Sequence, residues 1–189
     1  MSLLTATETL LRRLLRAPRT RGFGIQSPFA YGFVRYVVAE TLPYYAYDDL
    51  RAACPAIPKD NRRRLQLYLR IANYAQAAEC LDLAGDGEWF RAYVSAGCKK
   101  TVVSKDARQP RLLRMQTGPD QDADLKRCLD VAGNDALLII EGIRRDEKAK
   151  ALWQRLCQSP QTGTAFDLYD CGLVFLDTQK VKACYKVSY

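Results

Sequence analysis

The sequence contains no histidine among its 189 residues. This absence excludes Ser-His-Asp and Cys-His catalysis, histidine general bases and zinc sites with histidine ligands. The seven cysteines are spread along the chain, and no two lie closer than Cys171 and Cys184, so there is no CxxC pair for a zinc site or a thioredoxin-like motif. Any proton transfer must therefore use carboxylates, lysine, tyrosine or cysteine.

Long hydrophobic runs are also missing, and no stretch is apolar enough to cross a bilayer. The leucines near the N-terminus are interrupted by Arg12, Arg13 and Arg16, and no small-residue cleavage site follows them. This pattern predicts an amphipathic helix and not a secretory signal. Together with an odd number of cysteines, it predicts a cytoplasmic protein with free thiols and no membrane partner.

Positive charge is concentrated in the first part of the chain. The net charge is +8, and almost all of it comes from residues 1–70, including the run of arginines at residues 62–64. Such a basic region attracts an acidic partner or nucleic acid. A solvated helical face is the alternative explanation, and the sequence alone leaves both open.

The hydrophobic pattern changes near residue 79. Before it, apolar residues recur at helical spacing, which predicts an N-terminal helical cap over residues 1–78, with helices at 7–16, 28–39, 44–53 and 60–78. After it, strands and helices alternate, which predicts an α/β domain over residues 79–189 with a parallel sheet covered on both faces. The predicted strands are 79–84, 100–104, 112–116, 136–141, a terminal antiparallel hairpin at 164–169 and 173–177, and an edge strand at 182–188; the predicted helices are 88–96, 122–132 and 146–158.

The turn after the first predicted strand is a candidate ligand site. In parallel α/β sheets, ligands bind beyond the carboxyl ends of the strands. Gly85 and Gly87 allow close approach of a ligand to the backbone, and the helix that follows offers free amide groups. The carboxylates in the same turn disfavour phosphate and favour a nucleoside with a positive centre. A structural turn without a ligand explains the pattern equally well.

Three segments carry motifs of one family. Residues 21–34 (RGFGIQSPFAYGFV) match an N-terminal HGxHSPFxF motif at Gly22, Ser27, Pro28 and Phe29. Residues 80–88 match a strand that ends in an acidic residue followed by a glycine-rich loop. Residues 137–189 contain LLIIEGI, a helix with a tryptophan and FDLYDCGLVFL, in the family's order. The chain resembles a class I S-adenosylmethionine-dependent methyltransferase of a bacterial O-methyltransferase-like group.

This resemblance implies a Rossmann-like methyltransferase sheet and S-adenosylmethionine as the cofactor. By position in the family's motifs, the cofactor-binding residues would be Asp82, Ala84, Gly85, Gly87 and Asp106. Glu141 would lie in the reaction pocket as the catalytic residue.

The chain departs from the family's pattern at several of these positions. Ala84 replaces the first glycine of the loop, Asp106 is displaced from the end of the second strand, and Gln116 stands where an aspartate is expected. The family's Asp-Asp pair becomes Glu141-Gly142, so the carboxylates that would hold a catalytic metal are reduced to one, and no metal is expected. One strand–helix unit is missing between residues 106 and 112, which predicts a shortened sheet.

These departures predict a degenerate, non-catalytic methyltransferase-like protein that binds a partner or a small ligand. Trp89 and Phe90 are then expected to fill the space of the cofactor. One alternative is an active S-adenosylmethionine-dependent methyltransferase that acts on a small molecule, and a second is a nucleic-acid-binding protein that uses the basic N-terminal region. The shortened sheet leaves an edge to cover, so a homodimer is an expected partner.

Overall fold

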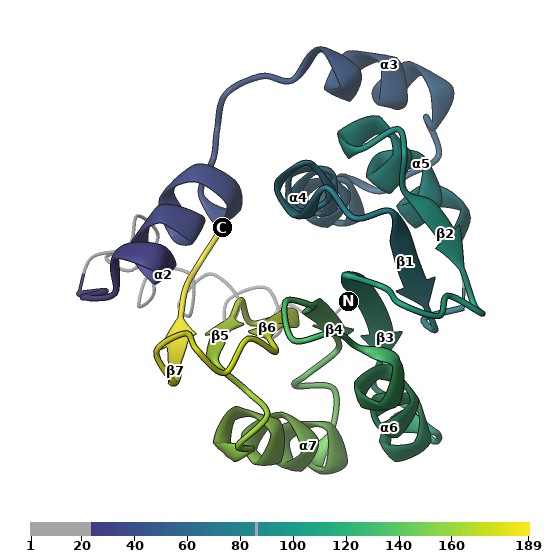
Figure 1. Ribbon diagram of the computed structural model, residues 1–189. Coiled ribbons are helices and arrows are strands. Elements are labelled where there is room, and N and C mark those ends of the chain that lie inside the picture. The colour runs from purple at the N-terminus through teal and green to yellow at the C-terminus, as the bar shows by residue number, and fades with distance from the viewer. Residues whose placement is uncertain (1–23, 86) are drawn as a thin grey trace, which may run out of the picture.

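The computed structural model describes residues 24–85 and 87–189. Its seven strands form one mixed sheet in the order β2-β1-β3-β4-β6-β5-β7 (Figure 1). β2, β1, β3 and β4 are parallel, β6 is antiparallel to both of its neighbours, and β7 is parallel to β5. The strands are β1 (Glu79–Asp82), β2 (Val102–Ser104), β3 (Leu112–Gln116), β4 (Leu137–Glu141), β5 (Thr164–Asp167), β6 (Cys171–Phe175) and β7 (Ala183–Lys186).

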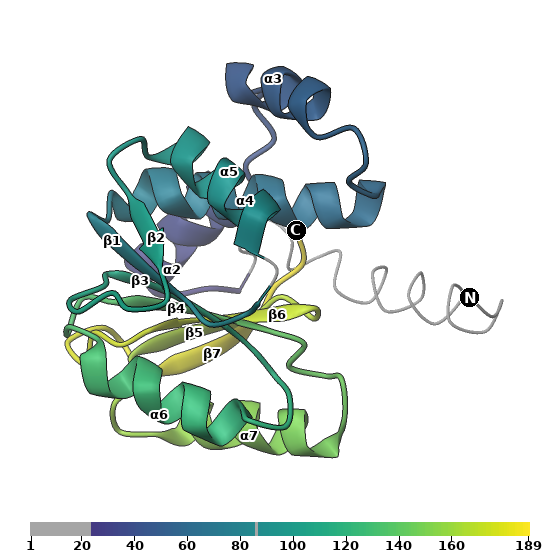
Figure 2. The ribbon, with the colours of Figure 1, turned by 90° about the vertical axis from the view of Figure 1, so that its right-hand side faces the viewer.

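Helices cover both faces of this sheet (Figure 2). One face carries α2 (Pro28–Phe33), α4 (Lys59–Ala75) and α5 (Gly87–Gly97), and the other carries α6 (Gln121–Val131) and α7 (Glu147–Gln158). The π-helix η2 (Val34–Val38) continues α2, and α3 (Tyr45–Ala53) lies outside α5. The predicted α/β fold with an antiparallel C-terminal hairpin and N-terminal helices is confirmed.

The chain lacks a strand–helix unit between β2 and β3, at the predicted place, although the sheet as a whole has seven strands. β2 pairs only with β1 and is therefore an edge strand. Seven residues, 105–111, lead from β2 to β3 without a helix between them. The chain thus passes directly from the edge strand to the strand on the other side of β1.

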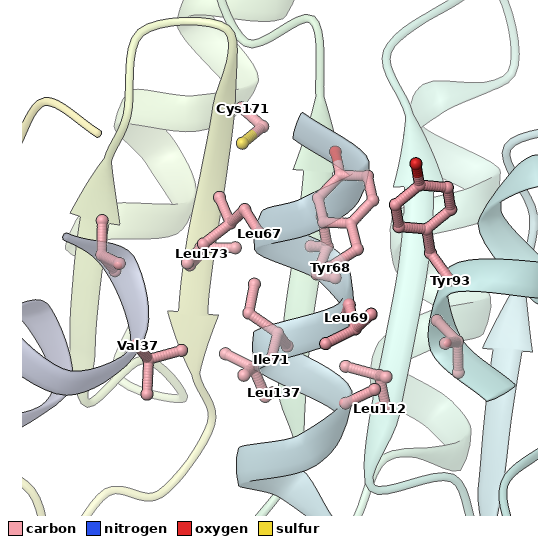
Figure 3. Packing of buried hydrophobic residues seen from close by; sticks show 14 of the residues in the cluster. Val37, Leu67, Tyr68, Leu69, Ile71, Tyr93, Leu112, Leu137, Cys171 and Leu173 are labelled. Carbon is pink, nitrogen blue, oxygen red and sulfur yellow. The ribbon is translucent and has the colours of Figure 1, made fainter. Parts of the chain in front are cut away.

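The N-terminal helices share a core with the sheet. Figure 3 shows Ile71 of α4 beside Leu137 of the sheet and Leu67 beside Leu173, within one core cluster. The buried Arg70 donates hydrogen bonds from the same helix to the carbonyl oxygens of Val37 and Val38, at 2.7 and 3.1 Å. These bonds satisfy carbonyls at the end of η2, so α4 connects η2 to the sheet.

The start of α2 follows the rules for helix N-termini. Ser27 accepts a hydrogen bond from the backbone N–H of Ala30 at 3.3 Å, and Pro28 occupies the first helical position. The predicted helix at residues 7–16 and its arginines lie outside the described residues. Among the residues that are described, no helix is long and apolar enough to cross a membrane.

The C-terminal hairpin differs from the prediction at its turn. The sequence predicted a turn at residues 170–172 because Gly172 is a typical turn residue. The turn instead lies at residues 168–170, where Tyr169 has φ +79°, and β6 already begins at Cys171. Gly172 lies inside β6. A glycine is required at this position because a Cβ there would come within 2.2 Å of the Trp153 ring. The glycine makes room for Trp153 of α7, which belongs to the buried core on this face of the sheet.

Candidate functional site

The order of the strands reverses at β1, which has β2 on one side and β3 on the other. The carboxyl ends of these strands therefore form the switch point at which α/β sheets bind ligands. Two cavities lie along this edge, of about 370 and about 430 Å³.

We call the smaller cavity the glycine-loop pocket, because the turn between β1 and α5 forms one wall. Its lining comprises Asp82, Gly85, Gly87, Glu88, Arg91, Ala92, Ser95, Val103, Ser104 and Lys105. Gly85 has φ +92°, a conformation that favours glycine. A Cβ at Gly87 would come within 2.7 Å of Asp82 Oδ2, so a glycine there lets α5 begin directly against this carboxylate.

The cofactor residues predicted by the resemblance fall in different places. Asp82, Gly85 and Gly87 come together in the glycine-loop pocket. Ala84 is buried in the turn and donates its backbone N–H to Asp82 Oδ1 at 3.2 Å. Asp106 lies outside the lining of this pocket and forms an exposed ion pair with Arg127 of α6 at 3.2 Å. In its place, the end of β2 contributes Ser104 and Lys105.

We call the larger cavity the arginine pocket. It lies over the ends of β3 and β4, with α4 and the start of α5 beside it. Its lining comprises Asn61, Arg64, Leu65, Tyr68, Trp89, Phe90, Arg114, Gln116, Glu141, Gly142, Arg144, Arg145, Tyr169 and Asp170. Trp89 is partly exposed here, whereas Phe90 is buried.

A buried ion cluster lies between the two pockets. Arg114 of β3 donates from Nε to Glu141 Oε1 at 2.8 Å, and from Nη1 to the two carboxylate oxygens of Asp82 at 3.2 and 3.3 Å. We call Asp82, Arg114 and Glu141 the arginine cluster. The exposed fractions of the three side chains are only 8, 5 and 7%. One guanidinium therefore pairs with two of the three carboxylates that the resemblance assigned to ligand chemistry.

Neighbouring groups complete the arginine cluster. The Tyr68 hydroxyl donates to Glu141 Oε1 at 2.9 Å, and Arg64 Nη1 lies 3.9 Å from Glu141 Oε2. The guanidinium carbon of Arg114 lies 4.3 Å from the centre of the Phe90 ring, a cation–π contact. These contacts orient Arg114 and engage Oε1 of Glu141 in two hydrogen bonds, whereas Oε2 has only the longer ion-pair contact with Arg64.

The charges of the cluster are mutually stabilised. Burial lowers the pKa of Arg114, but Glu141 and Asp82 raise it by more, so the pKa lies above its ordinary value and the guanidinium stays charged. Burial also raises the pKa of Tyr68 well above its ordinary value, so Tyr68 stays a hydrogen-bond donor. A carboxylate with these partners is held as an acceptor of internal hydrogen bonds.

Arg114 and Tyr68 were not among the site residues expected from the sequence, which placed them only in a predicted strand and a predicted helix. The signal that could have found Arg114 is its position between Leu113 and Met115, because an arginine inside an apolar strand requires a buried carboxylate partner.

Metal ligands do not gather in this region. Within residues 24–85 and 87–189, no group of three or more cysteine, aspartate or glutamate side chains is placed to hold an ion. Glu141 has a guanidinium as its partner where a metal centre would need further carboxylates.

The fold and this edge together define the class of protein that the chain resembles. The structure matches an O-methyltransferase from Bacillus cereus in complex with SAH, with a TM-score of 0.51, 10% identity, and coverage of 75% of this chain and 96% of the other. It also matches cofactor-bound Rv0187 from MTB, with a TM-score of 0.51, 12% identity, and coverage of 80 and 98%. No protein-family model and no curated protein matches the sequence. The fold is that of S-adenosylmethionine-dependent O-methyltransferases, as the sequence motifs indicated.

Proposed function

We propose that this protein has a methyltransferase fold but does not transfer methyl groups, and that it binds a small ligand at the carboxyl edge of its sheet. The arginine cluster is the observation that carries this proposal. Asp82 and Glu141 have kept their places, but both are paired with Arg114.

Electrostatics argue against binding of S-adenosylmethionine. Its sulfonium carries a positive charge, and it would have to lie across an edge where Arg114 is already a buried cation. The two carboxylates that could balance this charge already pair with the Arg114 guanidinium, at 2.8 to 3.3 Å. Lys105 lies at the end of β2, where the family has an acidic residue for the ribose hydroxyls, so the second anchor is missing as well.

Proton transfer is also poorly supported in the arginine pocket. Deprotonation of an acceptor hydroxyl needs a base within hydrogen-bond reach. Glu141 Oε1 already accepts from Arg114 and Tyr68, and its Oε2 faces Arg64. Burial raises the pKa of Tyr68, so this phenol stays protonated and cannot take up a proton.

Calorimetric titration with S-adenosylmethionine and SAH tests the proposal. With protein cleared of carried-over ligand, we expect no binding at millimolar concentrations. Gly85→Trp is the matched control, because it places a bulky side chain in the glycine-loop pocket. Micromolar binding to the natural chain that is lost in Gly85→Trp would contradict the proposal and support the alternative, an active methyltransferase.

The arginines at residues 62–64 of the basic region contact the protein itself. Arg62 donates to the carbonyl of Ile57 at 3.1 Å, Arg63 lies over the Tyr189 ring at 5.5 Å, and Arg64 donates to Asn61 at 3.3 Å. These contacts do not favour a free phosphate-binding surface. Nucleic-acid binding stays a prediction, and a steep loss of affinity with salt would support it.

The expected homodimer also stays a prediction. β2 is an edge strand and Val102 on it is 64% exposed, so this edge is available for pairing. Light scattering after gel filtration measures the oligomeric state, and a strictly monomeric protein would contradict the expectation.

A further inference from the structure

Two cysteines that are distant in sequence meet at the other edge of the sheet. Cys157 lies in the last turn of α7 and Cys184 in the edge strand β7, 27 residues apart. Their sulfur atoms are 3.1 Å apart. The side chain of Cys184 is exposed and that of Cys157 is half-buried, so a small molecule in solution can reach the pair.

The other cysteines do not share this setting. Cys80, Cys98, Cys128 and Cys171 are buried. Burial raises the pKa of the Cys128 thiol to about 12 and raises the pKa values of Cys80 and Cys171 as well, which makes these thiols unreactive.

The pair is chemically asymmetric. The Cys157 thiol donates its hydrogen bond to the Cys184 sulfur. This bond lowers the pKa of Cys184, to which the positive charges of Lys186 and Arg144 also contribute, whereas it raises the pKa of Cys157. Cys184 is therefore the thiolate that attacks in the first step, and Cys157 is the thiol that attacks the mixed disulfide in the second step.

We propose that Cys157 and Cys184 form a reversible disulfide by exchange with a small-molecule disulfide such as oxidised glutathione. The Cys184 thiolate first attacks one sulfur of oxidised glutathione, which gives a mixed disulfide and releases a glutathione thiolate. That thiolate takes up the proton of Cys157, and the Cys157 sulfur then attacks Cys184 and releases the second glutathione. The protein loses two hydrogen atoms, and one oxidised glutathione becomes two reduced ones.

The local structure allows the bond to close. A disulfide needs its sulfurs about 2 Å apart, so they must approach by about 1 Å. β7 is held by a strand on one side only, at β5, which leaves it free to adjust. Lys182 just before β7 already donates to the carbonyl oxygen of Gln158 at the end of α7, at 2.7 Å, and this keeps the two cysteines aligned.

The disulfide would fix the C-terminal strand beside the arginine pocket. After β7, Val187 donates its backbone N–H to Asp167 at 2.9 Å, and the Tyr189 ring packs on Arg63. A cross-link from α7 to β7 removes conformational freedom from the unfolded chain and stabilises the folded one. In a reducing compartment such a bond is transient, as expected for a redox-sensitive site.

The test uses the full chain incubated with oxidised glutathione and then treated with an alkylating reagent. Intact mass should show the loss of two hydrogen atoms, and peptide mapping should show Cys157 linked to Cys184. The oxidised protein should unfold at a temperature several degrees higher, and dithiothreitol should reverse the shift. Cys184→Ser should abolish both the cross-link and the shift, whereas Cys54→Ser, at another half-buried cysteine, should keep both.

Several outcomes would overturn the proposal. A stable glutathione adduct on Cys184 without linkage to Cys157 would show that the second step does not occur. Cross-links that join two chains, or that involve other cysteines equally, would show that Cys157 and Cys184 do not link preferentially to each other. Cys184→Ser changes an exposed side chain, so the test does not depend on a variant that fails to fold.

Discussion

The two pockets at the carboxyl edge of the sheet are built in different ways. The glycine-loop pocket is formed by a tight turn, with Gly85 in a positive-φ conformation and Gly87 against Asp82. The arginine pocket has an internal cation, Arg114, that pairs with Asp82 and Glu141. A buried carboxylate is costly without a partner. Arg114 balances Asp82 and Glu141 from within the protein, so the proposed function gives these residues a structural role.

The largest expected effect comes from Arg114→Met, because it leaves Asp82 and Glu141 buried without their cation. We expect a loss of about 3–5 kcal/mol in the free energy of unfolding, measured by urea denaturation. The triple variant Asp82→Asn, Arg114→Met and Glu141→Gln is the control, since it removes all three charges together. It should recover most of the loss. If Arg114→Met alone were as stable as the natural protein, the structural role of the arginine cluster would be contradicted.

Tyr68→Phe should have a smaller effect. It removes one hydrogen bond to Glu141 while the ring remains packed, so we expect a loss of about 1–2 kcal/mol in the free energy of unfolding. Tyr74→Phe on the same helix is the matched control, because Tyr74 is 45% exposed. Equal effects of the two substitutions would mean that the hydroxyl of Tyr68 contributes nothing.

The same substitution at two glycines tests whether the positive φ at Gly85 constrains the turn of the glycine-loop pocket. Gly85→Ala should cost about 1 kcal/mol in unfolding free energy, because φ is +92° there although nothing lies within 4 Å of the new Cβ. Gly32→Ala, at a position with equally open space inside α2, should stabilise by about 0.5–1 kcal/mol. Chemical denaturation of both variants checks the signs. If the unfolding free energies of both variants shift in the same direction, the positive φ at Gly85 does not constrain the loop.

The smallest expected effect is that of Lys105→Asp, which returns a carboxylate to the end of β2. We expect no gain in SAH binding by calorimetry, because Arg114 still occupies Asp82 and Glu141. Micromolar binding by this variant would show that the missing ribose partner, and not the arginine cluster, excludes the cofactor.

Much of the fold could be predicted from the sequence because the local patterns are strong. The strand at residues 112–116 was predicted with the bounds that β3 has, and α5, α6 and α7 lie within one or two residues of their predicted positions. The hairpin turn was misplaced because Gly172 serves long-range packing with Trp153, which no local pattern reveals.

The site was less predictable, because it depends on register between strands. Asp82, Gly85 and Gly87 are neighbours in the chain, and their proximity follows from one motif. The contact of Arg114 with Asp82 requires the parallel register of β1 and β3, which places the two residues opposite each other. Asp106 follows β2, the neighbour of β1, and was therefore expected near the glycine loop. The turn after β2 instead brings Asp106 to Arg127.

The most direct test of the account is a crystal structure of the full chain grown with millimolar SAH. The account predicts that Arg114 keeps its bonds to Asp82 and Glu141 and that no SAH lies across the edge of the sheet. SAH seated over the glycine loop, with Arg114 displaced from either carboxylate, would contradict it.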